Sequence, residues 1–177
     1  VLMGRRAARH RFVPHHYVFP GGRVDRADYV VVPRSPLRAP VLHKLCESCD
    51  RRLASALAVT AVRETWEETG LVLGTLREGS LLPDLQYLDY VLRAITPAQS
   101  PMRFHARFFL VEARHLSGTL LGNGELLDLA WRPVAECLKL PIVDVTEFFL
   151  RRLQDDAFAE SHKAELFSFR NGRVRLT

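Results

Sequence analysis

The hydrophobic positions of this chain fall into several short runs separated by polar, glycine-rich or proline-rich segments. Runs of three to nine residues with alternating or continuous apolar character are typical of β-strands. The first of them gives way to Gly4-Arg5-Arg6, which we expect to be a basic loop. The predicted strands are residues 1–3, 17–19, 87–92, 103–111 and 125–131.

One stretch has the period of a helix instead. From Arg51 to Thr69, small and apolar residues recur every three or four positions on one broad stripe, which predicts a helix packed on a sheet. Gly70 follows where a helix takes a left-handed cap. Two shorter helices are predicted at 134–138 and 146–153, the latter capped by Thr146, and Asn171-Gly172 predicts a hairpin within 167–176.

The long helix ends in a group of carboxylates. Glu64, Glu67 and Glu68 stand at i, i+3 and i+4, so they share one face, where like charges repel by about 0.2–0.5 kcal/mol per pair. They also lie at the negative end of the helix dipole. Three anions in this position are either a solvated surface or a cation site. A bound divalent cation would reverse the local balance of charge, and we favour this interpretation.

Residues 29–50 are irregular in composition, with Pro33, Pro36 and Pro40 and then Cys46-Glu47-Ser48-Cys49. We interpret them as an insertion, a surface excursion with a short helix near its end. The CxxC with His43 upstream is half of a zinc site, but no second pair of ligands follows, so a reduced pair of cysteines is the preferred interpretation.

Length and composition narrow the class of protein. The 177 residues suit a single domain, and 47% hydrophobic and 25% charged residues are ordinary globular values. No run approaches the ~18 apolar residues of a membrane span, so we expect a cytoplasmic protein with no membrane partner. The net charge is +5 and 22 of the 25 basic residues are arginine, but they are scattered, which favours a phosphorylated small molecule over nucleic acid.

The residues around the carboxylates match a known family. Arg63-Glu64, Glu67-Glu68 and Gly70-Leu71, together with Gly22, resemble the Nudix box, G-x5-E-x7-R-E-U-x-E-E-x-G-U with U apolar. Phe19-Pro20-Gly21-Gly22 is similar to the usual entry to that box. The chain is thus identified as resembling the Nudix hydrolases.

The match departs from the pattern in two ways. Asp28 stands where the first box glutamate is expected, and 34 residues separate it from Arg63 where the pattern allows seven. The box is therefore split by about 27 extra residues. This arrangement resembles a Nudix subgroup whose better-known members act on coenzyme A and its esters. The resemblance assigns no role to Asp28.

The resemblance implies a fold, a reaction and a cofactor. The fold would be an α/β/α sandwich around a mixed β-sheet, and the reaction would be hydrolysis of a nucleoside diphosphate linked to another moiety. Mg²⁺ or Mn²⁺ would be the cofactor, held by Glu64, Glu67, Glu68 and the backbone carbonyl of Gly22. A homodimer is a further expectation from the family.

Catalytic and substrate-binding roles follow from the same resemblance. Arg63 would orient a box glutamate through a bidentate ion pair. The general base is either Glu64 or the loop residue Glu125, and the sequence leaves both open. For binding the substrate, the candidates are three arginines near strand ends, Arg5, Arg6 and Arg103.

Three functions remain open on sequence alone. The leading one is a metal-dependent diphosphatase of coenzyme A or an acyl-CoA. The second is the same chemistry on ADP-ribose, a nucleotide sugar, NADH or a nucleoside triphosphate, because specificity is set by loops outside the box. The third is a Nudix-like binding module without turnover, against which the three retained carboxylates argue.

Overall fold

The computed structural model describes residues 1–8, 13–96, 103–158, 164–170 and 173–176. Its helices are α1 (Ala39–Cys46), α2 (Arg51–Thr69), α3 (Val134–Cys137) and α4 (Asp144–Gln154). The strands are β1 (Leu2–Arg6), β2 (Tyr17–Val18), β3 (Leu71–Val72), β4 (Gly74–Arg77), β5 (Ser80–Pro83), β6 (Asp89–Ile95), β7 (His105–Leu110), β8 (Ser117–Gly118), β9 (Leu126–Trp131), β10 (Glu165–Arg170) and β11 (Arg173–Leu176).

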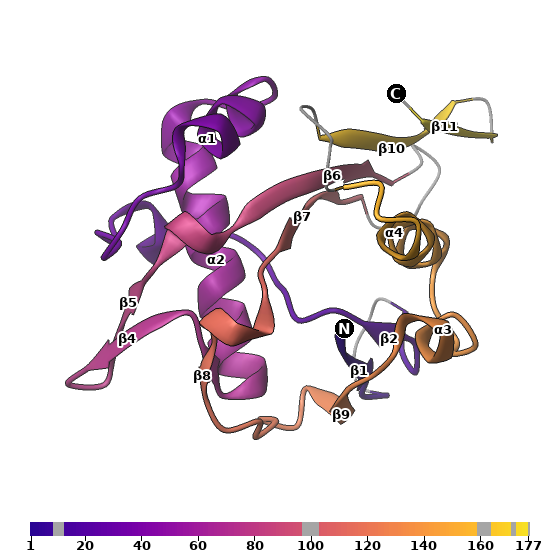
Figure 1. Cartoon of the computed structure of the whole chain (residues 1–177), viewed down its shortest axis with the longest axis horizontal. Helices are drawn as coiled ribbons and strands as arrows, with labels where there is room; N and C mark the ends of the chain where they lie inside the picture. Colours follow the sequence, from indigo (N-terminus) through magenta and orange to yellow (C-terminus); the bar gives the residue numbers. More distant parts are fainter. Residues whose placement is uncertain (9–12, 97–102, 159–163, 171–172, 177) are drawn as a thin grey trace.

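Two sheets form the centre of the molecule. The first has the order β2-β1-β9 and is antiparallel throughout. The second has the order β11-β10-β6-β7. It is mixed, because β10 runs parallel to β6, whereas the pairs β10-β11 and β6-β7 are antiparallel. Two short ribbons, β3-β8 and β4-β5, complete the strands (Figure 1).

Helices cover both faces of the second sheet. Tyr90 and Leu92 are two residues apart in β6, but a register shift between them marks a β-bulge, so they pack in different layers. Tyr90 joins the core cluster beneath α1 and α2, and Leu92 joins a cluster around Phe149 of α4. This α/β/α arrangement around a mixed sheet confirms the predicted fold class. No helix in the described ranges is long and apolar enough to cross a membrane.

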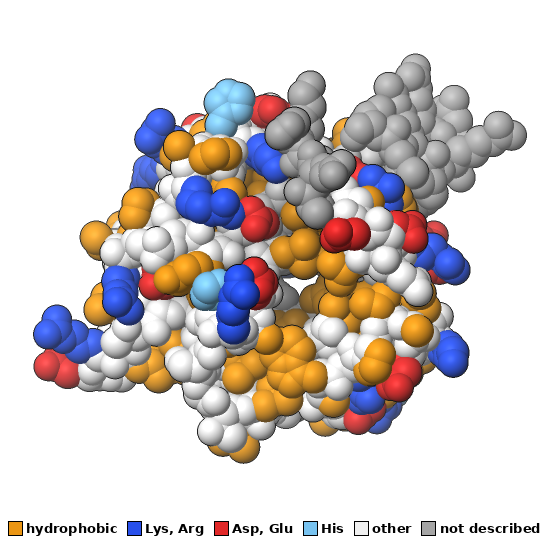
Figure 2. All heavy atoms as spheres, viewed as in Figure 1, with side chains coloured by type: hydrophobic (Ala, Val, Ile, Leu, Met, Phe, Trp, Pro, Cys, Tyr) orange, Lys and Arg blue, Asp and Glu red, His pale blue; other side chains and the backbone are white. Residues whose placement is uncertain are grey.

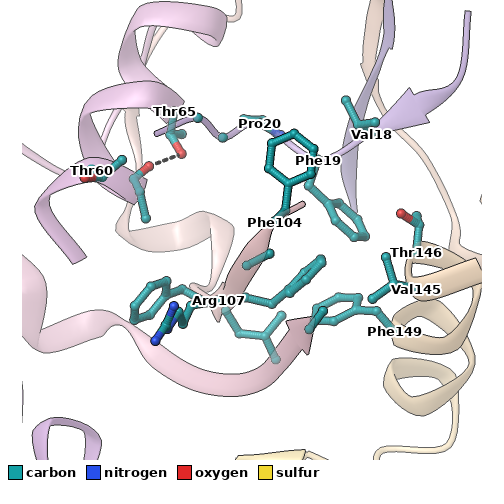
Figure 3. A pocket seen from close by; sticks show the side chains of 18 of the residues that line it. Val18, Phe19, Pro20, Thr60, Thr65, Phe104, Arg107, Val145, Thr146 and Phe149 are labelled. Atoms are coloured by element: carbon teal, nitrogen blue, oxygen red, sulfur yellow. Dashed lines mark hydrogen bonds between the residues drawn. The ribbon is translucent and has the colours of Figure 1, made fainter. Parts of the chain in front are cut away.

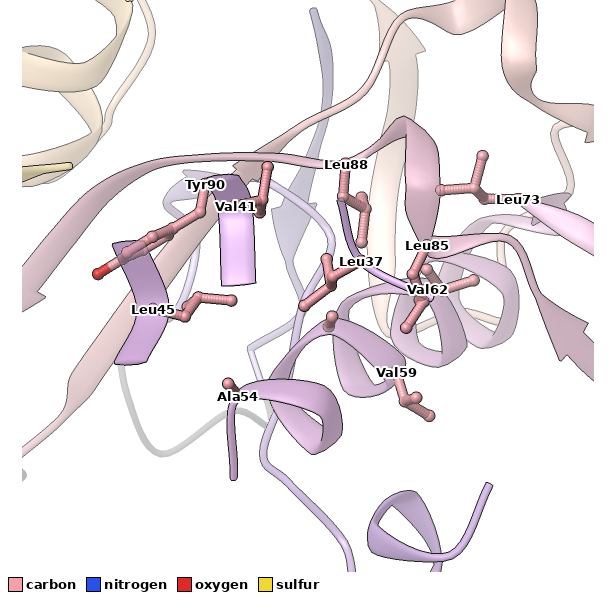
Figure 4. Packing of buried hydrophobic residues seen from close by; sticks show 11 residues of the cluster. Leu37, Val41, Leu45, Ala54, Val59, Val62, Leu73, Leu85, Leu88 and Tyr90 are labelled. Carbon is pink, nitrogen blue, oxygen red and sulfur yellow. The ribbon is translucent and has the colours of Figure 1, made fainter. Parts of the chain in front are cut away.

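The insertion contributes to the core, which corrects the expectation of a surface excursion. Val30 and Val32 are indeed 74% and 80% exposed. Beyond them, however, Leu37, Val41 and Leu45 are buried against α2 and β6 (Figure 4). The predicted short helix is α1. Its apolar face excludes water from the same cluster as Tyr90, so this segment is part of the domain rather than an appendage.

Helix α2 begins and ends with well-formed caps. The Asp50 side chain accepts a hydrogen bond from the backbone N–H of Leu53 at 2.7 Å. At the other end Gly70 has a φ of 75°, and its N–H donates to the carbonyl of Trp66 at 2.8 Å. The predicted helix boundaries and the glycine cap are both confirmed. They set the position of Glu64, Glu67 and Glu68 in the last turns.

Some sequence-based boundaries were wrong. Gly4–Arg6 is not a loop, because β1 continues through it between β2 and β9. Thr146 does not cap α4, which begins at Asp144 and buries Thr146 in its first turn. Residues 81–83, which no predicted element covered, belong to the β4-β5 hairpin. The predicted tail hairpin is present as β10-β11, although Asn171-Gly172 lie outside the described residues.

Candidate active site

The last turns of α2 lie against the glycine turn that follows β2. The backbone N–H of Gly21 donates to Oε2 of Glu68 at 2.8 Å. The Glu64 carboxylate lies directly on Gly22, where a Cβ would stand 2.1 Å from Oε1 of Glu64. Only glycine allows this approach. The two halves of the split box, far apart in sequence, therefore meet in space.

Arg63 joins these halves by ion pairs. Its Nε and Nη2 donate to Oδ1 and Oδ2 of Asp28 at 2.9 and 3.0 Å. Nη2 also donates to the carbonyl oxygen of Arg23 at 3.0 Å. Nη1 lies 3.0 Å from Oε1 of Glu64 and 2.9 Å from Oε2 of Glu67. The planar guanidinium thus holds Asp28 in a bidentate pair and positions two box glutamates.

Asp28 has a clear partner set, which the sequence did not assign. Its side chain is 1% exposed and accepts hydrogen bonds from Thr60 Oγ1 and the backbone N–H of Asp25, each at 2.8 Å. Burial alone would raise the pKa of Asp28, but the hydrogen bonds from Arg63, Asp25 and Thr60 outweigh it and lower the pKa. Asp28 is therefore a buried carboxylate that anchors Arg63.

Glu64 and Glu68 have raised pKa values, because both are partly buried and lie near other negative charges. Burial raises the pKa of Glu68 to about 7 although the Gly21 N–H opposes it, and the charges of Glu64 and Glu125 raise it further. Burial also raises the pKa of Glu64, against the effect of Arg63 and with added repulsion from Glu67 and Glu125. Such crowding of partly buried anions is typical of a functional site.

Glu125 and Arg6 belong to this group. The carbonyl oxygen of Glu125 accepts from the N–H of Ala7 at 3.3 Å, and Arg6 pairs with Leu126 across β1 and β9. The charge of Glu125 acts on both Glu64 and Glu68, and that of Arg6 lowers the pKa of Glu68. The structure therefore brings this predicted base candidate and this predicted substrate arginine to the box.

The other two predicted arginines lie elsewhere. Arg5 follows the alternation of β1 to the opposite face from Arg6, where its charge acts on Tyr17 and Asp128. Arg103 is exposed and lies two residues before the start of β7. Neither is among the charges that shift the pKa of Glu64 or Glu68. A substrate role for Arg5 and Arg103 stays a prediction.

The carboxylates at the end of α2 are the candidate ligands for a metal ion. Within the described ranges, no three His, Cys, Asp or Glu side chains are gathered closely enough to hold one. Glu64 and Glu67 turn to Arg63, and Glu68 turns to Gly21. The chemistry of the set still fits a hard divalent cation, because carboxylate oxygens are its preferred ligands and their mutual repulsion is what it would relieve. Cys46 and Cys49 are free thiols near α1.

A large cavity opens beside this group. It has a volume of about 1180 Å³ and extends from Gly21-Gly22 and Arg6 along α2 to β7. Figure 2 shows a hollow near the centre of the face, bordered mainly by hydrophobic side chains. The aromatic side chains of its wall include Phe19, Phe104, Phe108, Phe109 and Phe149. Phe19, Phe108 and Phe149 pack against one another with ring centroids 5.0–6.3 Å apart (Figure 3).

Sequence reasoning did not identify this cavity or the role of Thr60. Thr60 precedes Arg63 by three residues, so a shared helix face was a usable signal for their common partner Asp28. The sequence did single out Phe19, but only as the first residue of the Phe19–Gly22 segment that leads into the box. The aromatic cavity itself had no local signal, because its phenylalanines come from the segment after β2, the segment before β7, β7 itself and α4.

Comparison with known proteins gives two solved structures of interest, while scans of family models and of curated proteins give no match. A NUDIX hydrolase from Alicyclobacillus acidocaldarius is 30% identical, with a TM-score of 0.67, over 86% of this chain and 82% of that one. The Mutator MutT protein from Bacillus halodurans is 15% identical, with a TM-score of 0.55, over 99% of this chain and 88% of that one, a similarity of fold. The identity and coverage of the first match show that this chain belongs to the Nudix hydrolase family and is a Nudix-type pyrophosphohydrolase.

Proposed function

We propose that this chain hydrolyses the diphosphate bond of a nucleoside diphosphate linked to another moiety, with Mg²⁺ or Mn²⁺ as cofactor. The proposal rests on the observation that the two halves of the split box lie against each other. Arg63 and Asp28 fix α2 against the Gly21-Gly22 turn, so that Glu64, Glu68 and Glu125 face one another beside a large cavity. This is the arrangement that a hydrolase of a charged diphosphate needs.

Each residue has a separate role in the proposal. Glu64, Glu67 and Glu68, with the carbonyl of Gly22, would hold the divalent cation. When bound, the cation supplies charge neutralisation for the phosphate oxygens and a lowered pKa for a water molecule. Arg63 positions Glu64 and Glu67 and has its own orientation fixed by Asp28. Arg6 contributes positive charge on the substrate side of the site.

Two residues are candidates for the base that takes a proton from the attacking water. Glu64 and Glu125 both lie in the charged group around Glu68. A glutamate with a raised pKa accepts a proton more readily near neutral pH, and burial raises the pKa of Glu64. Glu125 lies directly before β9, and its charge acts on both Glu64 and Glu68. Comparing the pH–rate profiles of Glu64→Gln and Glu125→Gln distinguishes them, because loss of the base removes the acidic limb of the profile.

The moiety linked to the diphosphate is proposed to be the remainder of coenzyme A or an acyl-CoA. The mainly apolar cavity beside Gly21-Gly22 supports a large organic group. A panel of dinucleotides, coenzyme A esters, nucleotide sugars and triphosphates, incubated with Mg²⁺ or Mn²⁺, tests this by mass analysis of the products. Turnover of the coenzyme A esters is the expected result, and it should stop when EDTA is added.

The alternatives give different results in the same panel. Preferred turnover of ADP-ribose, a nucleotide sugar, NADH or a triphosphate would replace the proposed substrate but keep the chemistry. Binding without turnover of any member would make the chain a binding module. Homodimerisation stays a prediction, to be measured by light scattering on the purified protein.

A further inference from the structure

A second group of like charges lies on β6 and β7, away from the box. Arg93 and Arg107 face each other across these strands in register, and His105 stands two residues before Arg107 on the same strand face. Like charges directly opposite each other on a sheet are destabilising. In the described parts of the chain, neither arginine forms an ion pair with a carboxylate. The two guanidinium groups therefore lack a counter-charge.

The hydrogen bonds of these arginines do not supply the missing negative charge. Arg93 Nε donates to Nε2 of His105, and Arg107 Nη1 donates to the carbonyl oxygen of His105 at 3.0 Å. The Nε of Arg107 is buried and has no hydrogen-bond partner among the described residues. Burying a donor without a partner costs about 1–3 kcal/mol. This atom is thus positioned to donate to a group that the protein itself does not provide.

The imidazole between the two arginines is kept neutral. Burial, together with the charges of Arg107 and Arg93, lowers the pKa of His105 to about 4. At neutral pH His105 therefore accepts the Arg93 hydrogen bond and adds no third positive charge. Burial also lowers the pKa of Arg107, and Arg93 contributes in the same direction. Both shifts are what a bound anion would reverse.

Arg107 adjoins the same cavity as the box, and Arg93 lies opposite Arg107 on β6. Arg107 lines the cavity, as do Thr65, Ala61 and Leu57 of α2. Leu57 and Thr65 are eight residues apart, which is about 12 Å along a helix. In Figure 3, Arg107 lies across the pocket from Phe149 and Val145, below Thr60 and Thr65. A ligand whose diphosphate lies at Gly22 would thus extend along α2 toward Arg107.

We propose that Arg93 and Arg107 form a second anion subsite, which binds a phosphate monoester carried by the substrate at a distance from its diphosphate. The proposal rests on the proposed function and names the substrate class, a diphosphate with a further phosphate on its organic part. Phosphate fits better than a carboxylate, because two guanidinium forks offer several N–H donors to a tetrahedral dianion. The insertion borders the subsite through Cys49, whose pKa is affected by the charges of Arg107 and Arg93.

The test compares ligands that differ only in the remote phosphate. Coenzyme A is compared with 3′-dephospho-coenzyme A, and NADPH with NADH, by calorimetry in EDTA so that no turnover is needed. The wild-type protein should bind the phosphorylated member of at least one pair about tenfold more tightly, the expected effect of one or two charge-assisted hydrogen bonds. In Arg107→Gln this preference should fall to about twofold or less.

Two further variants make the result decisive. Arg93→Gln should have the same effect as Arg107→Gln and replaces it if that variant does not fold. Arg77→Gln, on the exposed β4-β5 hairpin, is the matched control and should keep the wild-type preference. Equal binding of both members in both pairs by the wild type would overturn the proposal, as would a preference that survives in Arg107→Gln and Arg93→Gln. Lack of turnover with Mg²⁺ would count against the proposed function alone, because the binding ratio does not depend on catalysis.

Discussion

The carboxylate group at the end of α2 and the arginine pair on β6 and β7 are opposite in charge but similar in design. Each places like charges side by side in a partly buried position. The carboxylates have protein partners, in Arg63 and the N–H of Gly21, whereas among the described residues the arginines form side-chain hydrogen bonds only with His105. The first group is therefore preorganised by the protein, and the second depends more on its ligand.

The largest effect is expected from Glu67→Gln. It removes one anion from the carboxylate group but keeps the shape of the side chain, so the fold should persist. Turnover should fall more than about 100-fold, because even outer-shell partners of a metal are worth 10–100-fold. Product release is measured by mass, and melting temperature reports the fold. Glu112→Gln, at an exposed glutamate paired with Arg114, is the control; full activity in Glu67→Gln would contradict the site assignment.

Asp28→Asn tests the anchor of the carboxylate group. Removing one partner of a buried ion pair costs about 3–5 kcal/mol, and the 19% exposure of Arg63 should reduce this to about 2 kcal/mol. Urea denaturation at pH 7 measures the free energy of unfolding.

The contribution of Asp28 to the free energy of unfolding should decrease as the pH falls. The folded-state pKa of Asp28 is lowered, so its contribution is present above the unfolded value of about 4 and is lost as pH falls through the folded pKa. The stabilities of wild type and Asp28→Asn should therefore converge below about pH 4. Parallel curves down to the most acidic folded condition would show that Asp28 does not carry this charge.

Gly22→Ala separates positioning from stability. The new Cβ would meet the flexible end of Glu64 at 2.1 Å, so the carboxylate should move aside and the backbone should stay in place. The free energy of unfolding should change by less than about 1 kcal/mol. Turnover should fall by at least about tenfold, because Glu64 is a proposed metal ligand and even outer-shell partners of a metal are worth 10–100-fold. A large loss of stability with normal turnover per folded molecule would refute this.

The smallest effect concerns the arginine pair. Phosphate bound between Arg93 and Arg107 would offset the two charges that lower the pKa of His105. Its pKa should rise from about 4 by about one unit when inorganic phosphate saturates the subsite. NMR titration of the imidazole measures this, with the signal assigned by its absence in His105→Gln. An unchanged pKa of His105 at saturating phosphate would show that the arginine pair does not bind an anion in the way the carboxylate group is proposed to bind a cation.

Local sequence patterns could predict the carboxylate group because one helix carries it. The spacing of Glu64, Glu67 and Glu68, the cap at Gly70 and the entry segment Phe19–Gly22 are all features of continuous chain. The α/β/α sandwich and most of its elements could be predicted from the same periodicities. The strand status of Gly4–Arg6 could not, since two polar residues in a strand are determined by pairing with β2 and β9 rather than by their own pattern.

The sequence by itself determined the acidic helix end, its glycine cap and the two halves of the box. Only the tertiary structure decided that Asp28 anchors Arg63 across the insertion, that α1 belongs to the core, and that Arg107, which lines the cavity, lies opposite Arg93. The physical reason is the range of the interactions. Helix geometry relates residues three and four apart, whereas strand register and ion pairs between distant segments depend on how the whole chain packs.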